Sequence, residues 1–150
     1  MAFGVGDADT VLSPVADSPG MRVVHESADG GTVLASDVDI AEGVVETSKG
    51  LMFRSSIPEA YALVFEFDPP SGLAAKLPFA SDDAVARRII HMLFVRFPID
   101  VLWLQGETVA HVKTLRPWIG LGMADADRII ELPAGAADGV EVGDTVVVKK

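Results

Sequence analysis

IIHMLFVRFPIDVLWLQ, residues 89–105, is the densest apolar run in the chain, and the fold follows from it. Its two halves, on either side of Phe97-Pro98, are rich in β-branched and aromatic residues, which favour strands. Residues 89–97 are apolar at nearly every position, as expected of a strand covered on both faces. Residues 81–92 also fit a helix, but we prefer the strand. We therefore expect two central strands here, with a sheet built around them.

Further strand patterns lie on both sides of this run. Residues 101–105 and 108–114 alternate around Gly106-Glu107, which predicts a hairpin. Residues 21–27 and 32–37 flank Ala28-Asp29-Gly30-Gly31 and predict another. Additional strand-like runs occupy residues 61–67, 128–132 and 145–149, whereas residues 118–122 resemble a flexible loop and residues 134–140 a short helix or turn.

One main helix is predicted between the first hairpin and the strand at 61–67. Asp39 and Glu42 have the spacing of a capping box, so the helix should begin at Asp39. Ile40 and Val44 would share one helical face, and Gly50 would end the helix in a left-handed cap. The predicted fold class is therefore mostly β (α+β). We expect a small barrel or a curled antiparallel or mixed sheet of six or seven strands with this helix.

The size of the chain predicts one domain. Its 150 residues and 15.8 kDa suit a single core, so we expect one globular β-rich domain over residues 20–150. Residues 1–19 are rich in Gly, Asp, Ser and Pro and predict a flexible N-terminal arm. Nothing in them resembles a signal peptide, and no apolar run reaches the roughly 18 residues of a membrane helix. These features predict a soluble cytoplasmic protein that does not bind a membrane.

Charge and cysteine content limit the possible partners. The formal net charge is −10, and no basic patch is visible along the sequence, so we expect no nucleic-acid binding. The chain has no cysteine, which excludes disulfides, thiolate metal sites and thiol nucleophiles. Gly120 and Gly122 lack the third glycine and the helix of a dinucleotide site. We expect no cofactor and no resident metal, and a monomer rather than an obligate oligomer.

The acidic composition leads to a first prediction, that stability rises with salt. An excess of Asp and Glu with only five lysines is typical of proteins from a high-salt cytoplasm. The Debye length falls from about 10 Å at 0.1 M salt to about 3 Å at 1 M, so most self-repulsion should be screened there. The melting temperature should therefore rise strongly up to molar KCl. A flat profile would contradict the halophile-like interpretation.

Three ordered motifs carry a resemblance to a known family. They are Lys49-Gly50-Leu51-Met52-Phe53-Arg54, then Met92 with Phe97-Pro98-Ile99-Asp100, then Glu131-Leu132-Pro133-Ala134-Gly135 followed by Val142-Gly143-Asp144. This set resembles the domain of unknown function 192 family over about residues 21–149. The resemblance implies a compact, mostly β domain with a helix at the first motif, and no assigned biochemical role. Relatives usually carry Trp before the Met and Lys-Asn after it, where this chain has His91, Leu93 and Phe94.

Six residues are candidates for a binding site, and four of them have an ordinary structural alternative. Arg54 could bind an anion or only cap a helix end, and Asp100 could be a functional acid or only accept bonds from backbone amides. His91 could be a base or a hydrogen-bonded core histidine. Met52 could line a groove or pack in the core, and Trp118 is the aromatic residue best placed for an exposed contact. The sixth candidate is Glu131.

Two functions remain open from the sequence. The preferred one is a non-catalytic binding or accessory domain that recognises a small molecule or a protein through a groove near Arg54, Asp100 and Trp118. The alternative is a hydrolase-like enzyme with His91 as base and Asp100 or Glu131 as its orienting carboxylate. A metal held by His25, His91 and His111 would need tertiary proximity, because no HxH or HxxxH pair occurs. No catalytic residue is assigned.

Overall fold

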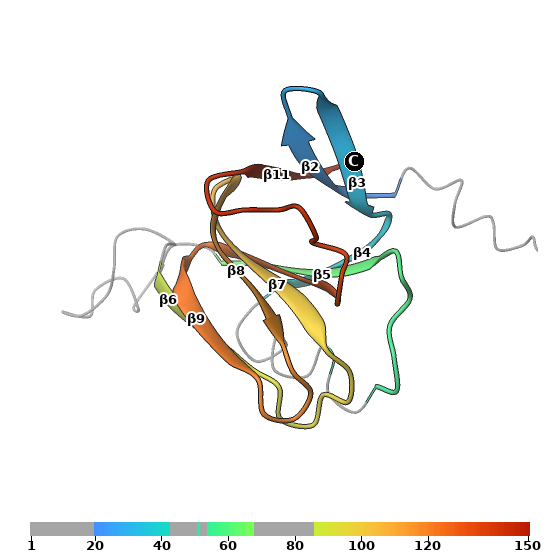
Figure 1. The fold of residues 1–150 in the computed structure, drawn as a ribbon, viewed down its shortest axis with the longest axis vertical. Coiled ribbons are helices and arrows are strands. Elements are labelled where there is room, and N and C mark those ends of the chain that lie inside the picture. Colours follow the sequence, from blue (N-terminus) through green and yellow to red (C-terminus); the bar gives the residue numbers. More distant parts are fainter. Residues whose placement is uncertain (1–19, 43–50, 52–53, 68–85) are drawn as a thin grey trace, which may run out of the picture.

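The computed structural model describes residues 20–42, 51, 54–67 and 86–150 (Figure 1). In this part of the chain all regular elements are strands. The ten strands form two sheets. In chain order the strands are β2 (Arg22–Ser27), β3 (Gly30–Ala35), β4 (Asp37–Glu42), β5 (Tyr61–Glu66), β6 (Ala86–His91), β7 (Ile99–Gln105), β8 (Thr108–Leu115), β9 (Leu121–Ala126), β10 (Arg128–Pro133) and β11 (Thr145–Lys149).

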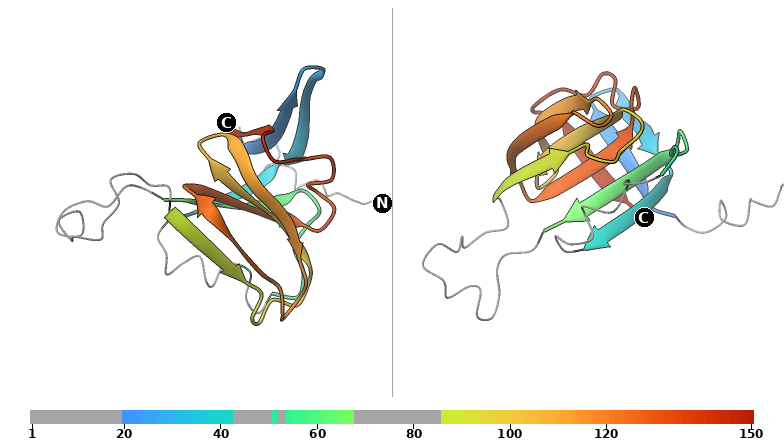
Figure 2. Two further views of the ribbon diagram at one scale, coloured as in Figure 1. Left: turned by 60° about the vertical axis from the view of Figure 1, so that its left-hand side comes forward. Right: turned by 90° about the horizontal axis from the view of Figure 1, so that it is seen from below.

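Eight strands form one curled mixed sheet in the order β3-β2-β11-β8-β7-β10-β5-β4. Its neighbouring strands are antiparallel except β4 and β5, which run parallel. Only Ser36 separates β3 from β4, and the curl brings β2 toward β4 (Figure 2). No ladder joins β3 to β4, so the sheet is curled but is not the closed barrel that was one of the predicted forms.

Two apolar clusters lie on the two faces of this sheet. All eight strands contribute to the cluster inside the curl, the inner cluster, which includes Leu102, Leu104 and Ile130. Alternate residues of β5, β7 and β10, such as Trp103 and Ile129, face the other side and form the outer cluster. Strands covered on both faces carry continuous apolar runs, which is why these three strands have no polar face.

The second sheet covers part of the outer cluster. It is a two-stranded antiparallel ribbon of β6 and β9, called the ribbon below (Figure 2). Trp103 is fully buried beneath it, and its indole nitrogen donates to the carbonyl of Arg88, 3.1 Å away. A Cβ atom at Gly122 would lie only 2.6 Å from the Trp103 ring, so only glycine permits this close approach of β9 to the sheet.

The prediction of a main helix beginning at Asp39 is wrong. Residues 37–42 form β4, because Val38 and Ile40 pack on the inner cluster and the backbone pairs in parallel with β5. The Asp39 carboxylate caps no helix and instead accepts a hydrogen bond from the Tyr61 hydroxyl. Residues 43–50 lie outside the described residues, and no helix occurs within those that are described.

Other strand predictions are confirmed or corrected. The two predicted hairpins and the strands near residues 61–67, 128–132 and 145–149 are confirmed. The strand predicted for 89–97 ends at His91, and Ile89 is 56% exposed rather than covered on both faces. The loop predicted for 118–122 is a turn followed by β9, so the described residues contain ten strands rather than six or seven. The predicted arm at 1–19 lies outside the described residues.

Candidate functional site

Two turns at one end of the ribbon present aromatic side chains in an unusual backbone conformation. Phe94 has φ 64° and Trp118 has φ 67°, a left-handed region that bulky residues rarely adopt. Their rings meet edge to face with centroids 5.6 Å apart, and the two residues are 39% and 49% exposed. Such backbone strain costs about 1–3 kcal/mol per residue and concentrates at functional sites.

Backbone hydrogen bonds hold these two turns together. The Met92 amide donates to the Gly120 carbonyl at 3.0 Å, and the Trp118 amide donates to the Val95 carbonyl at 3.1 Å. A Cβ atom at Gly120 would lie 2.6 Å from the Arg116 carbonyl oxygen, so the second turn is too tight for a side chain there. The aromatic pair is therefore displayed by a fixed framework. Both turns lie at the lower end of Figure 1.

The apolar surface continues along the ribbon. Ile89 faces Met123 across the two strands, and Leu121 faces His91. Alternation places these side chains on the outer face of the ribbon, while Gly122 lies on the inner face against Trp103. We call the whole apolar area the ribbon surface; its members are between 39% and 69% exposed and comprise Ile89, Leu93, Phe94, Trp118, Ile119, Leu121 and Met123.

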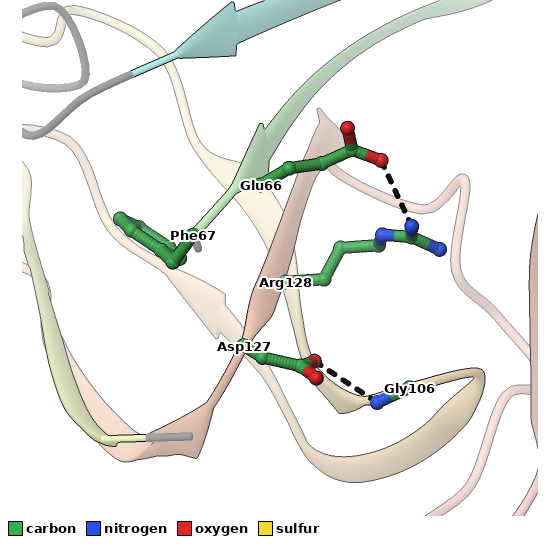
Figure 3. Close-up of a pocket in the computed structure, with 5 residues that line it drawn as sticks. All are labelled: Glu66, Phe67, Gly106, Asp127 and Arg128. Carbon is green, nitrogen blue, oxygen red and sulfur yellow. Dashed lines mark hydrogen bonds and ion pairs between the residues drawn. The ribbon is translucent and has the colours of Figure 1, made fainter. Parts of the chain in front are cut away.

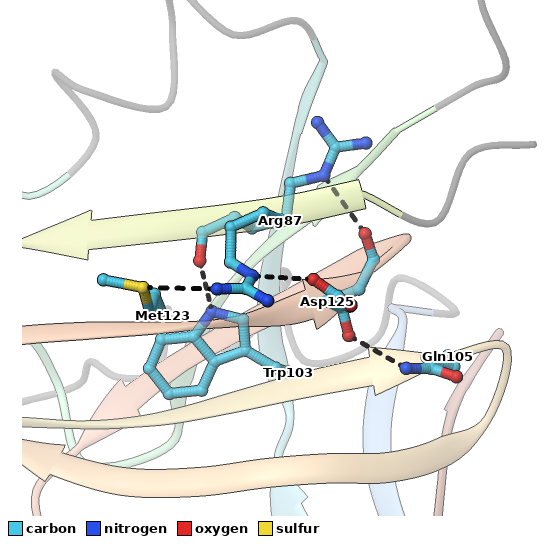
Figure 4. Close-up of polar contacts among 7 residues, drawn as sticks. Arg87, Trp103, Gln105, Met123 and Asp125 are labelled. Carbon is cyan, nitrogen blue, oxygen red and sulfur yellow. Dashed lines mark hydrogen bonds and ion pairs between the residues drawn. The ribbon is translucent and has the colours of Figure 1, made fainter. Parts of the chain in front are cut away.

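Polar contacts at the other end of the ribbon fix its position (Figure 4). On the outer face Arg87 donates to the Asp125 carboxylate at 2.8 Å and lies 3.7 Å from the Met123 sulfur. The Gln105 amide of β7 donates to the Asp125 carbonyl at 3.1 Å. With the bond from Trp103 to the ribbon backbone, these contacts join both ribbon strands to β7. The ribbon surface therefore rests on a rigid support.

Glu131 is buried on β10, and among the described residues it has no hydrogen-bond partner. The side chain is on the outer-cluster face, beside Leu63 and Val101 on the neighbouring strands, and the residue is 6% exposed. In the described part of the chain, no hydrogen-bond donor contacts its carboxyl group. Burial raises the pKa of Glu131 to about 8. The group is therefore mostly a neutral carboxylic acid at neutral pH.

Asp100 is also buried, but it lies on the opposite face of the sheet and is fully hydrogen-bonded. The Thr114 hydroxyl donates to one carboxylate oxygen at 2.6 Å. The amides of Gly135 and Ala137 donate to the other oxygen at 2.9 and 3.0 Å. Asp100 thus anchors the turn that follows β10 to the sheet, which favours its structural interpretation.

Arg54 lies beside Tyr61, away from the ribbon surface. Its guanidinium carbon is 5.3 Å from the centre of the Tyr61 ring. The Tyr61 hydroxyl donates to Asp39 at 2.9 Å, and burial, followed by this bond, raises the pKa of Tyr61 to about 12. Tyr61 is three strand spacings, about 14 Å, from Leu115 at the end of β8. None of the described contacts of Arg54, Asp100 and Trp118 joins one of these residues to another, and Met52 lies outside the described residues.

His91 does not have the setting expected of a catalytic base. The residue is exposed at the end of β6, and its Nδ1 accepts a bond from the Leu93 amide at 3.3 Å. No described carboxylate is hydrogen-bonded to it, and Asp100 and Glu131 lie buried on opposite faces of the large sheet. The sequence placed His91 in an apolar central strand; it instead closes a turn at the edge of the ribbon surface.

The three histidines do not meet at a metal site. His25 is hydrogen-bonded to Asp144 at 2.9 Å, and His111 packs against the Trp103 ring with centroids 5.1 Å apart. The Glu141 amide and His25 both donate to Asp144, and these bonds lower the pKa of its carboxyl group. Among the described residues, no three His, Asp or Glu side chains gather closely enough to hold a metal ion.

A shallow hollow of about 190 Å³ lies between the β7–β8 turn and the start of β10 (Figure 3). Its charged groups already have partners. Arg128 pairs with Glu66 at 2.8 Å, and Asp127 accepts a bond from the Gly106 amide at 2.9 Å. Phe67 forms the apolar part of the lining. The hollow is open, and its paired charges leave little to hold a ligand.

The sequence missed most of the ribbon surface. Trp118 was identified as an exposed aromatic, but the exposure of Ile89 and Met123 and the pairing of Phe94 with Trp118 depend on β6 and β9 meeting in the fold. One signal was present. Leu93 and Phe94, where the chain departs from the pattern of the family it resembles, both lie on this surface.

Fold and site together define a mostly β domain, built on a curled mixed sheet, that carries an apolar surface on a second, smaller sheet. The chain belongs to the DUF192 family, described as “Uncharacterized ACR”, whose model matches residues 24–148. No curated protein matches the chain. Within the described residues there is no helix long and apolar enough to span a membrane.

Two solved structures share the fold. One, titled a “putative transcription regulator” from Sinorhizobium meliloti, has a TM-score of 0.63 and 19% identity, covering 85% of this chain and 92% of the other. The second, a protein of unknown function from Novosphingobium aromaticivorans, has a TM-score of 0.65 and 20% identity, covering 84% and 83%. These similarities extend to the fold alone.

Proposed function

We propose that this chain is a non-catalytic binding domain that recognises a protein partner through the ribbon surface. The observation that carries the proposal is the pair of exposed aromatic residues, Phe94 and Trp118, held in a strained conformation in the two turns at one end of the ribbon surface. Contiguous exposed apolar area of this kind marks interaction sites, and tryptophan is prominent among residues that dominate binding energy.

A protein fits this surface better than a small molecule does. Small-molecule sites are concave and bury most of their ligand, whereas the ribbon surface consists of two turns and the outer face of two strands. The hollow beside Arg128 is concave, but its charges are already paired. Reactive groups are also not assembled at the ribbon surface, since His91 is bonded to a backbone amide and not to a carboxylate.

Selection of peptide ligands tests this proposal. Short random peptides displayed on phage would be selected on the wild-type protein, and each selected peptide would then be measured against Trp118→Gly. Glycine suits a φ of 67°, so this variant should remain folded while losing the aromatic side chain. We expect binding to fall by at least about tenfold, as for a residue at the centre of an interface. Fluorescence polarisation would measure the affinity and urea unfolding the stability.

Val142→Ser is the matched control. Val142 is 62% exposed, but its turn packs beside Val109 near the start of β8, whereas Trp118 follows the other end of that strand. The control should retain the affinity of the wild type. Peptides that bind Trp118→Gly as tightly as the wild type, or the absence of any selected peptide, would contradict the proposal.

A further inference from the structure

We infer that the partner segment bound at the ribbon surface is acidic as well as apolar, an inference that rests on the proposed function. The basis is a separation of charge that the folded chain makes visible. The ribbon surface is bordered by exposed cations, although the protein as a whole carries a formal charge of −10.

The separation of positive from negative charge is already present in the sequence. Residues 86–99 and 108–124 supply β6, β8, most of β9 and the two aromatic turns. They contain none of the 22 Asp and Glu residues of the chain, but five of its 12 Lys and Arg residues. These two stretches together therefore carry +5, within a protein whose other residues carry −15. The five cations are Arg87, Arg88, Arg96, Lys113 and Arg116.

Three of these cations border the aromatic turns. Arg96 follows Val95, whose carbonyl accepts the Trp118 amide, and Arg116 begins the turn that carries Trp118. The Lys113 ammonium group reaches the carbonyl of Leu121 at 2.9 Å. All three cationic residues are exposed, and within the described part of the chain none of them forms an ion pair. Their charge is therefore available to a partner.

The other two cations are already engaged. Arg87 pairs with Asp125 at 2.8 Å, and Arg88 lies over the Phe67 ring at 3.8 Å. The nearby carboxyl groups do not neutralise the border either. Asp100 is buried, and its carboxylate accepts hydrogen bonds from neighbouring donors. Glu131 is buried with a raised pKa. Among the described residues, the cations that border the aromatic turns are therefore not neutralised, and an anionic segment would be attracted to them.

The aliphatic members of the ribbon surface favour a protein partner over a nucleic acid or an anionic membrane. Five of the seven members of the ribbon surface are aliphatic or methionine, and these suit apolar side chains rather than stacked bases. Three cations on a protein of charge −10 also offer few phosphate contacts to a nucleic acid or an anionic membrane. The best match is a peptide segment that combines Asp or Glu with large apolar residues.

The peptides selected above provide the test. Those that lose affinity on Trp118→Gly should be enriched in Asp and Glu over the starting library. Their affinity should fall by about tenfold or more in the double variant Arg96→Ser with Arg116→Ser, as for charge pairs at an interface. It should also weaken between about 0.1 M and about 1 M salt, because the Debye length shortens. Arg22→Ser with Lys150→Ser changes the net charge equally on exposed residues near β2 and β11 and should have little effect.

The outcomes separate the two proposals. Trp118-dependent peptides without acidic enrichment, or with affinity that the double variant leaves unchanged, would overturn the acidic partner while leaving the binding surface in place. A complete absence of Trp118-dependent peptides would overturn both. Tighter Trp118-dependent binding to phosphatidylserine vesicles, or to a single-stranded DNA oligonucleotide, than to any peptide would replace the protein partner with a membrane or a nucleic acid.

Discussion

Glu131→Gln is expected to stabilise the protein at pH 8 and to remove much of the pH dependence of its stability. Glutamine has nearly the shape of a protonated glutamic acid but cannot ionise. Burial raises the pKa of Glu131 from 4.5 to about 8. The unfolded chain therefore releases this proton near its ordinary pKa, whereas the folded protein retains it up to about pH 8. The wild type has its full stability below the unfolded pKa and loses stability as pH rises through this window.

A shift of this size corresponds to about 4 kcal/mol lost by the wild type at pH 8. Urea unfolding of wild type and variant over this pH range would measure the difference. Glu107→Gln is the control, because Glu107 is exposed in the β7–β8 turn, and it should follow the wild type at every pH. Parallel stability curves for Glu131→Gln and wild type would show that the folded protein accommodates the ionised carboxylate, contrary to our expectation.

Asp100→Ala should destabilise the protein by about 3–5 kcal/mol, because it removes the acceptor of three hydrogen bonds at a buried site. The loss leaves the amides of Gly135 and Ala137 without their partner. Hydrogen bonds to a charged acceptor are worth more than neutral ones, and unsatisfied buried donors add their own cost. Equilibrium unfolding in urea at pH 7 would give the change in free energy.

Thr114→Val supplies the comparison for Asp100. It removes one donor of the three and should cost only about 1–2 kcal/mol. Hydrogen exchange of the Gly135 and Ala137 amides would locate the effect, because Asp100→Ala should expose both while Thr114→Val should leave them protected. If Asp100→Ala cost no more than Thr114→Val, the carboxylate would not be holding this turn.

The strands that the sequence predicted correctly have local signals. Glycine turns and alternating residues define the pairs β2–β3 and β7–β8, and apolar runs define β5, β10 and β11. The two strands that the sequence did not predict, β4 and β9, lack such local signals. β4 carries a capping-box pattern, and only its parallel pairing with β5 makes it a strand. β9 is rich in Gly and Ala because its inner face lies against the ring of Trp103, a contact that no local pattern reveals.

The candidate site was predictable only in part, because it too depends on contacts between residues that are distant in sequence. Trp118 stood out as an aromatic between a proline and a glycine-flanked turn, and Asp100 had a structural interpretation that its three hydrogen bonds favour. The neighbours that make Trp118 part of a surface are distant in sequence. Phe94 reaches it through bonds that join two separate turns. Charge segregation could be counted along the chain, but its meaning depends on which cations the fold leaves unpaired.

The pairing of β2 with β11 affects the order in which this protein can assemble during synthesis. Residues 22–27 hydrogen-bond with residues 145–149, so the first described strand has its second neighbour only after residues 145–149 have left the ribosome. The β2–β3 hairpin can form early, but a two-stranded hairpin by itself is only marginally stable in water. Long-range pairing of this kind slows folding, because the closure entropy is lost before the contacts form. Nascent chains should therefore hold this hairpin undocked until residues 145–149 have emerged, which gives chaperones a defined interval in which to act.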